Sequence, residues 1–521
     1  MTFDAAEDAL LRALGEHNPW WEPGGEMPNL PARTKSDFYH LVRPERDGSQ
    51  FEDQRVLGLV GRRGVGKTTL LQQFIIHRIE RGAAPEQFCY VPFGADPLYQ
   101  LDSEVGLRQA IRYYEGRILG RVPDPTPHFV LLDDVHPVEH PSKPSIEGWG
   151  TPVSDILEDA PERHVVVTAT AGVQVERELD RIDYPTEAYD TQPILPEKFR
   201  DYCFTLYPDL EEGDTRVSPT PVREGNGSLP HALETGDVAG LVETFRQQYD
   251  RVSAVEGRIQ SQVVHYLAMG GIVSYGLDGP VESAGELDAG TYTQLRENVR
   301  DALYQDVPDL ESVQTIADLE RLCALAARNR AAEPIRYQRL ADLFAVDRRT
   351  LTDSYLPALA QLYLLTGATE YDNSRPRAVR LYLRDTGLIT ALTDGTARGV
   401  LDDFEREAAL ARVAAFDHTM RFSYGVNAAQ GVASAPSVGF WRGRAGEVDF
   451  VFEVDGIPVP VGLAYRPSGP DATASVREFL DAYDAPVGLV LTGDAVQSAA
   501  RPITVEDGLI RLPYWFFLLL C

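Results

Sequence analysis

The stretch 61–69, GRRGVGKTT, constrains the fold of this 521-residue chain more than any other. It contains Gly61 and then Gly66-Lys67-Thr68, the G-x-x-x-x-G-K-[ST] pattern of a phosphate-binding loop. The apolar run 56–60 before the loop predicts a buried strand, and residues 70–76 after it predict a helix. Glycines at this spacing let successive backbone N–H groups and the helix N-terminus face a polyphosphate. The sequence therefore predicts a nucleotide-binding α/β domain.

The polar residues of the loop have separate expected roles. Lys67 would contact the β- and γ-phosphates of ATP, and the Thr68 hydroxyl would ligate Mg²⁺. Composition supports this role, because only four of the 49 basic residues are lysine and the planar guanidinium of arginine replaces a compact ammonium poorly. We expect the whole loop to line the nucleotide: Gly61, Arg62, Arg63, Gly64, Val65, Gly66, Lys67, Thr68 and Thr69.

A second motif lies about sixty residues after the loop. The run FVLLDD, residues 129–134, is apolar and ends in two carboxylates, the form of a Walker B strand. Asp133 would hold the Mg²⁺ shell, and Asp134 would orient or deprotonate the attacking water. A strand that ends in Asp is common, but its position after a phosphate-binding loop makes the pair specific. We therefore expect Lys67, Asp133 and Asp134 to act in ATP hydrolysis.

Further apolar runs complete the predicted domain. Residues 88–93 and 164–170 predict two more strands, and residues 105–119 predict a helix between them. Strands that alternate with helices indicate a parallel sheet with its ligand at the carboxyl ends of the strands. The hydroxyls of Thr168 and Thr170 would touch the γ-phosphate or the attacking water, or they would simply cap a turn.

Three histidines near the Walker B strand raise an alternative chemistry. His128, His136 and His140 lie on either side of Asp133, which would suit a metal-dependent hydrolase. These histidines straddle a strand that already carries a nucleotide motif. We therefore favour ATP hydrolysis over a histidine metal centre.

The composition indicates a halophilic, cytoplasmic protein. The formal net charge is −30, with 79 acidic and 49 basic residues. At about 1 M salt the screening length is about 3 Å, so such a surface repels little and nucleic acid is not excluded as a partner. Cys89, Cys203, Cys323 and Cys521 are far apart, which fits a reduced compartment without disulfides or structural zinc. We expect no signal peptide, and the longest apolar run, 515–521, is too short to span a bilayer.

Taken together, the motifs resemble those of the archaeal-type AAA+ ATPases. Besides the loop and the LLDDV and VVVTAT strands, the resemblance rests on NPWW at 18–21, QPILPEKFRD at 192–201, LAMGG at 267–271 and YLRDTGL at 382–388. It covers nearly the whole chain, which is similar to a haloarchaeal member with a winged-helix middle and a restriction-nuclease-like C-terminal domain. The resemblance implies a P-loop core that uses ATP and Mg²⁺.

Two positions bear on the activity that this resemblance implies. The family usually has Glu where this chain has Asp134, and the shorter side chain suggests slow hydrolysis. Arg181 lies where such ATPases present an arginine to a neighbouring subunit, which would require a homo-oligomer. The alternative is that Arg181 is an ordinary arginine on a surface helix.

The middle of the chain changes character. Residues 213–236 are rich in Gly, Pro, Ser and Thr and predict a loop or hinge. Helical periodicity from 238 to 330 predicts a lid. Residues 337–344 and 348–365 then predict two helices joined by a short turn, followed by a hairpin that ends at Arg384. Helix, turn, helix and hairpin together indicate a winged helix.

Arginine is concentrated in this predicted winged helix. Between Pro334 and Arg384, eight arginines stand against five acidic residues, a local excess of three positive charges. The functional interpretation is duplex DNA binding, and the alternative is a winged helix that serves only as a packing module. The candidate DNA contacts are Arg348, Arg349, Thr352, Arg375 and Arg377. The first three would enter the major groove, and the last two would contact the DNA backbone.

The C-terminal part resembles a nuclease that has lost its catalytic residues. GFWRGRAGEVDF is similar to the hairpin of restriction-type nucleases, which hold Mg²⁺ with an Asp on one strand and E-x-K on the next. Asp449 matches that Asp, and Glu405 or Glu407 would supply a helix carboxylate. Gly462 and Ala464, however, replace the Glu and Lys. We therefore expect a nuclease-like fold without nuclease activity.

These observations predict an α/β P-loop core with a parallel sheet, an all-α and winged-helix middle, and an α/β restriction-endonuclease-like C-terminal domain. The expected parts are an N-terminal arm at 1–50, the AAA+ core at 51–206, a linker and helical lid at 207–330, the winged helix at 331–390 and the degenerate nuclease domain at 395–521. The expected function is Mg²⁺-dependent ATP hydrolysis coupled to DNA-associated or conformational work. The alternative is a nucleotide-gated switch that binds a protein partner and turns over little.

Overall fold

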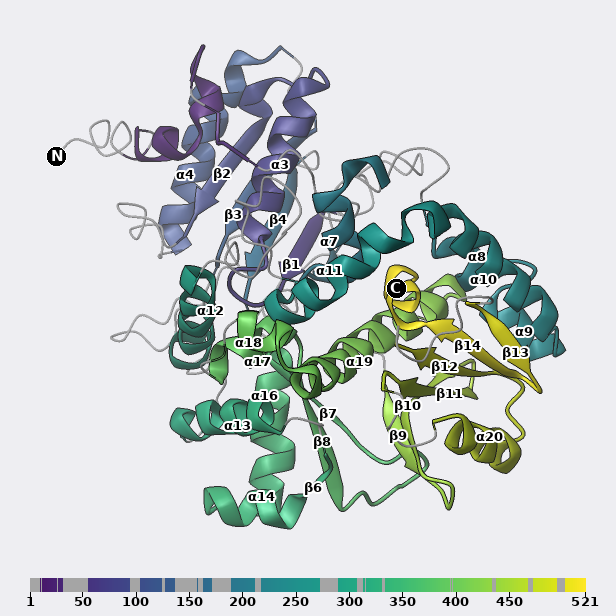
Figure 1. The fold of residues 1–521 in the computed structure, drawn as a ribbon. Coiled ribbons are helices and arrows are strands. Elements are labelled where there is room, and N and C mark those ends of the chain that lie inside the picture. The colour runs from purple at the N-terminus through teal and green to yellow at the C-terminus, as the bar shows by residue number, and fades with distance from the viewer. Residues whose placement is uncertain are drawn as a thin grey trace. The chain divides into compact units, whose positions relative to one another are not determined.

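The computed structural model divides the chain into two compact units, each with a hydrophobic core of its own (Figure 1). The first unit comprises Met1–Leu195, Asn298–Val313 and Gln361–Tyr363, and the second comprises Pro196–Glu297, Gln314–Ala360 and Leu364–Cys521. The structure describes residues 10, 12–25, 27–30, 55–93, 104–123, 127–135, 157, 163–170, 189–210, 217–271, 289–306, 313, 315–329, 333–393, 395, 397–432, 437–466, 472–493 and 502–521.

The first unit contains a five-stranded parallel sheet in the order β2-β3-β4-β1-β5. Its strands are β1 (Val56–Val60), β2 (Phe88–Pro92), β3 (His128–Asp133), β4 (Arg163–Ala169) and β5 (Tyr189–Pro193). The first four match the predicted strands to within one residue at either end. Every residue of β1, β3 and β4 is buried, as expected for a parallel sheet that is covered on both faces.

Strand order decides what can meet at the carboxyl edge of this sheet. The loop after β1 leads into α3 (Lys67–Glu80), and α4 (Glu104–Arg117) follows β2 in the chain. Strand β4 lies between β1 and β3. A residue at the end of β3 must therefore reach the start of α3 across the end of β4. Because all five strands are parallel, these three ends lie at one edge.

The second unit begins with helices. They are α7 (Phe199–Leu206), α8 (Thr220–Arg223), α9 (Leu229–Thr235), α10 (Val238–Val252) and α11 (Glu256–Met269), and α12 (Ala289–Asp301) begins in this unit. Helix α7 lies within the second unit. One expectation needs correction. The segment 213–236, expected as a loop, contains α8 and α9, because Ser228 caps α9 and Gly236 ends it in a left-handed conformation.

Helix α13 (Ile316–Arg328) lies in the region expected as a helical lid. The segment expected to be a winged helix then contains β6 (Ile335–Arg336), α14 (Tyr337–Phe344), α15 (Arg348–Thr350), a π-turn at Leu351–Tyr355, α16 (Leu356–Gln361), β7 (Leu365–Ala368), β8 (Ala378–Leu383) and α17 (Thr386–Leu392). The two helices and the hairpin follow in the expected order, and the short strand β6 was not predicted. The strands form a small antiparallel sheet in the order β6-β8-β7. The second predicted helix therefore consists of α15, the π-turn and α16.

The C-terminal part is a six-stranded mixed sheet between two helices. After α18 (Ala397–Leu401) come α19 (Phe404–Ala429), β9 (Gly439–Arg442), β10 (Glu447–Val454), β11 (Ile457–Ala464), α20 (Ala472–Tyr483), β12 (Gly488–Thr492), β13 (Thr504–Glu506), β14 (Leu509–Pro513) and α21 (Tyr514–Leu519). The sheet order is β13-β14-β12-β11-β10-β9. The ring of Phe450 lies 6.1 Å from that of Phe416 of α19, measured between centroids, whereas the next residue, Val451, packs with Val476 of α20. The two helices thus cover opposite faces.

Within the described ranges, none of the helices combines the length and the apolar character needed to cross a bilayer.

Candidate functional site

The phosphate-binding loop has backbone geometry that requires glycine. A Cβ atom on Gly61 would lie 2.2 Å from the carbonyl oxygen of Ile194, so no side chain fits there. Gly66 has a φ of 93° and is the N-cap of α3, a left-handed conformation that costs glycine little. The first N–H groups of α3 have no acceptor within the helix, so they are oriented toward an anion at the loop.

Lys67 is the first residue of α3 and is buried. Its Nζ donates to the carbonyl oxygen of Gly61 at 2.7 Å and to that of Arg62 at 3.2 Å. Both of these acceptors are neutral, so the two bonds hold the ammonium in the loop without cancelling its charge. This is the position from which Lys67 was expected to contact phosphate.

Asp133, at the end of β3, is held by three hydroxyl groups. Thr68 Oγ1 and Tyr90 Oη each donate to its Oδ2 at 2.7 Å, and Thr168 Oγ1 donates to its Oδ1 at 2.5 Å. The side chain is only 4% exposed. Hydroxyl and carboxylate oxygens are the ligands that Mg²⁺ prefers. Thr68 and Asp133, predicted as a pair from motifs far apart in the sequence, lie in contact and fit a Mg²⁺ ion.

Asp134 turns its carboxylate toward the phosphate-binding loop. Its φ is 54°, a left-handed conformation that Asp adopts more readily than most residues. The backbone N–H of Asp134 donates to Thr168 Oγ1 at 2.8 Å. Its Oδ2 lies 3.7 Å from an Nη of Arg63 in the loop. Backbone strain of this kind is found preferentially at functional sites, which suits the expected role of Asp134 beside the attacking water.

Thr168 has a more specific role than either expectation for it. Its hydroxyl bonds to the Asp133 carboxylate and the Asp134 backbone, so it holds the Walker B residues in place. Thr170 is buried just beyond β4, at the same edge of the sheet. Arg181, the candidate for action on a neighbouring subunit, lies outside the described residues.

The histidine alternative finds no support in the described part of the chain. His128 begins β3, at the opposite end of the strand from Asp133. Its ring contacts Glu115 at 3.3 Å, and Glu115 also forms an ion pair with Arg163. Burial would raise the pKa of Glu115, but the bonds and charges of these two partners lower it overall. His136 and His140 are not described, and no group of three or more metal-binding side chains occurs among the residues that are.

Sequence reasoning did not identify Tyr90 as part of this site. It lies within the predicted strand 88–93, where an aromatic residue is ordinary. Only the pairing of the strands indicates that Tyr90 belongs to the site. Tyr90 of β2 lies beside Leu131 of β3, so its side chain is on the same face of the sheet as Asp133, two residues further along β3.

In the segment 334–384, which was expected to be a winged helix, fewer unpaired arginines remain at the surface than the sequence count suggests. Arg380 is 2% exposed and forms an ion pair with Glu447. Arg384 is largely buried and forms an ion pair with Asp417 at 2.7 Å. Both partners lie outside the segment that was counted. Without these two arginines, six arginines stand against five acidic residues, so the expected excess of three charges falls to one.

The candidate groove residues already have partners within the segment. Arg348 donates to the carbonyl oxygen of Pro376 at 2.8 Å, and Arg349 forms an exposed ion pair with Asp353 at 3.2 Å. Thr352 Oγ1 donates to Asp353 at 2.8 Å. The backbone candidates Arg375 and Arg377 are exposed near the tip of the β7–β8 hairpin.

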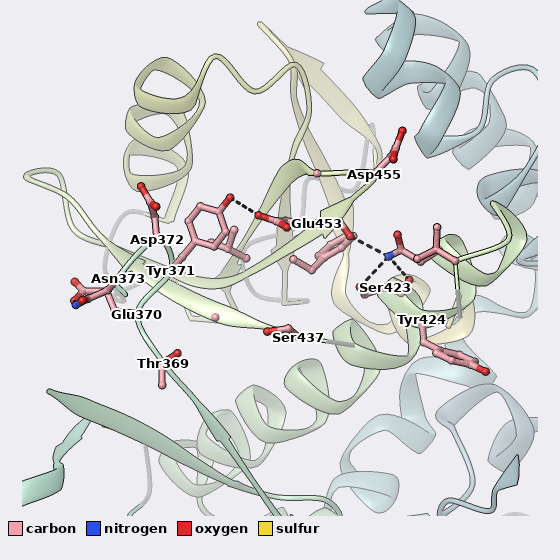
Figure 2. Close-up of a pocket in the computed structure, with 16 residues that line it drawn as sticks. Thr369, Glu370, Tyr371, Asp372, Asn373, Ser423, Tyr424, Ser437, Glu453 and Asp455 are labelled. Atoms are coloured by element: carbon pink, nitrogen blue, oxygen red, sulfur yellow. Dashed lines mark hydrogen bonds between the residues drawn. The ribbon is translucent and has the colours of Figure 1, made fainter. Parts of the chain in front are cut away.

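The loop that joins β7 and β8, residues 369–377, contacts the edge strand β9 of the C-terminal sheet. Tyr371 N donates to the Phe440 carbonyl at 2.7 Å, and Phe440 N donates to the Thr369 carbonyl at 3.0 Å. The Tyr371 hydroxyl donates to Glu453 at 2.8 Å (Figure 2). The segment thereby forms one β-bridge with β9, between Glu370 and Phe440, and it borders a cavity of about 520 Å³ whose walls also carry Asp372.

In the C-terminal sheet, Asp449, the residue expected to match the nuclease aspartate, is paired with an arginine. Asp449 is 6% exposed, forms an ion pair with Arg412 of α19 and accepts a hydrogen bond from Leu463 N at 2.7 Å. A Cβ on Gly462 would lie 2.9 Å from Val476, so this position faces α20. Glu407 accepts from Tyr465 at 2.5 Å, and Glu405 pairs with Arg466.

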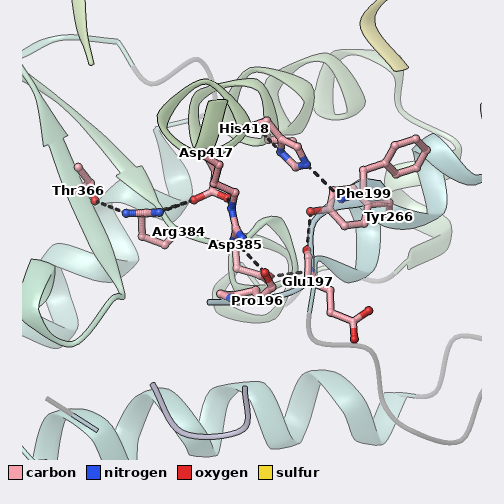
Figure 3. A network of polar contacts seen from close by, with 12 residues as sticks. Pro196, Glu197, Phe199, Tyr266, Thr366, Arg384, Asp385, Asp417 and His418 are labelled. Carbon is pink, nitrogen blue, oxygen red and sulfur yellow. Dashed lines mark hydrogen bonds and ion pairs between the residues drawn. The ribbon is translucent and has the colours of Figure 1, made fainter. Parts of the chain in front are cut away.

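A buried polar network holds the chain just after β5. Tyr266 Oη donates to the Glu197 carbonyl at 3.0 Å, and Phe199 N donates to His418 Nε2 at 3.1 Å (Figure 3). Burial lowers the pKa of His418 to about 4 despite the opposing charge of Asp417. A backbone N–H can only donate, so Nε2 is unprotonated here.

Comparison with known proteins agrees with the geometry of the first unit. Residues 53–203 match a family model described as an AAA domain, and residues 284–398 match one described as a domain of unknown function, DUF8612. The parallel sheet with its phosphate-binding loop lies within the residues that match the AAA domain model, which supports an ATP-binding domain of the AAA type in this part of the chain. No curated protein matches the sequence.

Several solved structures match the chain at low identity and low TM-score. The Walker-type ATPase PABY2304 of Pyrococcus abyssi is 14% identical, with a TM-score of 0.34 over 70% of this chain and 99% of that chain. The ORC1 protein of Aeropyrum pernix in complex with DNA is 15% identical, with a TM-score of 0.27 over 72% and 96% of the two chains. The ORC2 protein of Aeropyrum pernix is 15% identical, with a TM-score of 0.34 over 77% and 98%. Likenesses this distant say nothing about what this chain binds.

Proposed function

We propose that this chain hydrolyses MgATP and uses the reaction for conformational work on its second unit. The observation that carries the proposal is the contact of Thr68 with Asp133 at 2.7 Å, beside the buried Lys67. It joins the two motifs that a P-loop ATPase needs for its metal ion and its phosphates.

The residues divide the chemistry among them. Lys67 and the first N–H groups of α3 bind and orient the β- and γ-phosphates. Thr68 and Asp133 would hold Mg²⁺, which would supply positive charge against the charge that develops on the phosphates. Asp134 orients the attacking water and accepts its proton. Its side chain is one methylene shorter than Glu, and its Oδ2 lies 3.7 Å from the Arg63 guanidinium, so slow turnover is expected.

The direct test is phosphate release in molar KCl, with and without Mg²⁺. Asp134→Asn should bind ATP like the parent and lose turnover by about a hundredfold, the scale of a missing general base. Glu80→Gln, which changes an exposed acid at the far end of α3, is the matched control. Full turnover in Asp134→Asn would assign the water to another residue, and a parent that binds no ATP would refute the proposal.

Duplex DNA is the second candidate partner. The arginines near the hairpin tip and at the start of α15 support it, since they are exposed in a chain of net charge −30. The docking of Tyr371 on Phe440 supports the packing-module alternative. DNA-stimulated phosphate release favours the DNA-associated ATPase, whereas tight ATP binding with little turnover favours a nucleotide-gated switch.

For the C-terminal domain we propose a nuclease-like fold without nuclease activity. The Arg412 ion pair with Asp449 supports this, because the guanidinium already neutralises the carboxylate. No cleavage of single-stranded, duplex or branched DNA is expected with Mg²⁺ or Mn²⁺. Cleavage that survives Lys67→Ala but disappears in Asp449→Ala would contradict it.

A further inference from the structure

A buried tyrosine connects the outer strand of the first sheet to the metal position. Tyr90 of β2 lies beside Leu131 of β3, and Asp133 lies two residues further along on the same face. The long phenol side chain spans this distance and donates to Asp133 Oδ2 at 2.7 Å. A phenol hydroxyl is protonated at neutral pH, so Tyr90 is the donor in this bond.

The three hydroxyls on Asp133 are not equivalent. Thr68 is itself an expected metal ligand, so its hydrogen bond to the Asp133 carboxylate would change when its hydroxyl oxygen binds a cation. Thr168 and Tyr90 instead project from β4 and β2, the two neighbours of β3, and each holds a different carboxylate oxygen. Together they fix the plane of the carboxylate from both sides of the strand. Partners of this kind orient metal ligands.

The backbone of Tyr90 is hydrogen-bonded by Asn18 on the side of β2 that faces away from β3. Strand β2 is the last strand of the sheet, and the side-chain amide of Asn18 takes the place of a further strand. Asn18 Nδ2 donates to the Tyr90 carbonyl at 2.8 Å, and Tyr90 N donates to Asn18 Oδ1 at 2.7 Å. Trp20 and Trp21 both donate from their indole N–H groups to the Phe88 carbonyl, at 3.1 and 2.8 Å.

We propose that Tyr90 is the positioning residue for the metal ligand Asp133, and that the segment Asn18–Trp21 keeps it in place by closing the free edge of β2. The proposal rests on the proposed function, since it concerns the Mg²⁺ ligand of that site. The phenol acts through Asp133 and leaves the phosphate-binding loop untouched. Its loss therefore weakens metal binding and spares metal-free nucleotide binding.

The test is calorimetric titration of ADP into the full chain in molar KCl over a series of Mg²⁺ concentrations. Tyr90→Phe should bind metal-free ADP like the parent and need about ten times more Mg²⁺ for half of the metal-dependent gain in affinity. With ATP, kcat at moderate Mg²⁺ should fall while KM stays near the parent value. Tyr114→Phe is the matched control, because its buried hydroxyl donates at 2.8 Å to a backbone carbonyl, that of Glu86.

Asn18→Ala provides a second probe that leaves the phenol in place. It removes both side-chain bonds to the Tyr90 backbone and should raise the Mg²⁺ requirement in the same direction by a smaller factor. If Tyr90→Phe fails to fold, Asn18→Ala decides alone. An unchanged or lower Mg²⁺ requirement in the folded variants, or an equal rise in Tyr114→Phe, overturns the proposal while the proposed function stands. A parent that binds no nucleotide overturns both.

Discussion

Asp133 of the first unit and Asp449 of the second are both buried aspartates on strands, and they differ in what holds them. Asp133 is held by three neutral hydroxyls. Asp449 is held by the Arg412 guanidinium and a backbone N–H. Hydroxyls satisfy hydrogen bonds and leave the negative charge available to a cation, whereas a guanidinium cancels it. The partners of a buried carboxylate thus decide whether it can serve a metal ion.

In the second unit, close packing around Gly462 prevents a second metal-binding carboxylate from being placed near Asp449. A Cβ on Gly462 would lie 2.9 Å from Val476 and 3.1 Å from Ala472, both on α20. A glutamate at position 462 would therefore require α20 to move. In the first unit, Asp133 Oδ2 already accepts a hydrogen bond from Thr68, which directly follows Lys67 of the phosphate-binding loop.

The largest expected effect is on nucleotide binding in the first unit. Lys67→Ala should weaken MgATP binding about a thousandfold, which corresponds to two charged hydrogen bonds of roughly 2 kcal/mol each. Arg81→Ala, at the opposite and exposed end of α3, is the control. Calorimetry in molar KCl measures both, and unchanged affinity in Lys67→Ala would place the nucleotide elsewhere.

The same substitution at the two aspartates should have opposite consequences. Asp133→Asn should reduce ATP turnover about a hundredfold and leave the unfolding midpoint unchanged or slightly higher, because its three hydroxyl partners are neutral. Asp449→Asn should destabilise the second unit by about 3 kcal/mol, because it leaves the Arg412 charge uncompensated, and should spare turnover. Phosphate release and urea unfolding give the two readouts. Equal destabilisation by both variants would remove the contrast.

The pH dependence of stability should come in part from His418 in the second unit. The pKa of His418 is lowered from 6.5 to about 4 in the folded chain, so below pH 6.5 the unfolded chain binds a proton that the folded chain does not. Stability should therefore fall by at most about 3 kcal/mol as the pH drops from 6.5 toward 4. Urea unfolding across this range measures the loss. His418→Gln should flatten the profile, whereas His265→Gln, whose ring bonds a carbonyl of its own helix, should not.

The smallest expected effect concerns the winged-helix segment. Replacing Arg348 and Arg349 together with Ala should weaken duplex binding about tenfold if the segment contacts DNA. Arg398 and Arg477, exposed arginines with acidic partners outside this segment, provide a matched double-alanine control. Fluorescence anisotropy at several salt concentrations measures both. Equal binding by mutant and parent would favour the packing-module interpretation.

Short-range patterns in the sequence determined the parts of the molecule that depend on neighbours in the chain. The backbone conformation of the loop 61–69 requires glycine at particular positions, whatever surrounds the loop. The apolar runs at 56–60 and 129–134 predicted β1 and β3 to within one residue. The Thr68 and Asp133 pairing followed as well, because parallel strands bring their carboxyl ends to one edge. These features depend on backbone conformation and periodicity, which local sequence encodes directly.

Tertiary structure alone decided which side chains meet across strands and helices. Tyr90 reaches Asp133 because β2 lies beside β3, and no spacing in the sequence states that order. The sequence count treats Arg380 as a surface charge, but in the fold it is buried in an ion pair with Glu447. The sequence motif identifies Asp449 as a metal ligand, but in the fold it forms an ion pair with Arg412. Contacts between residues far apart in the chain depend on strand order and helix packing, which arise only when the whole core assembles.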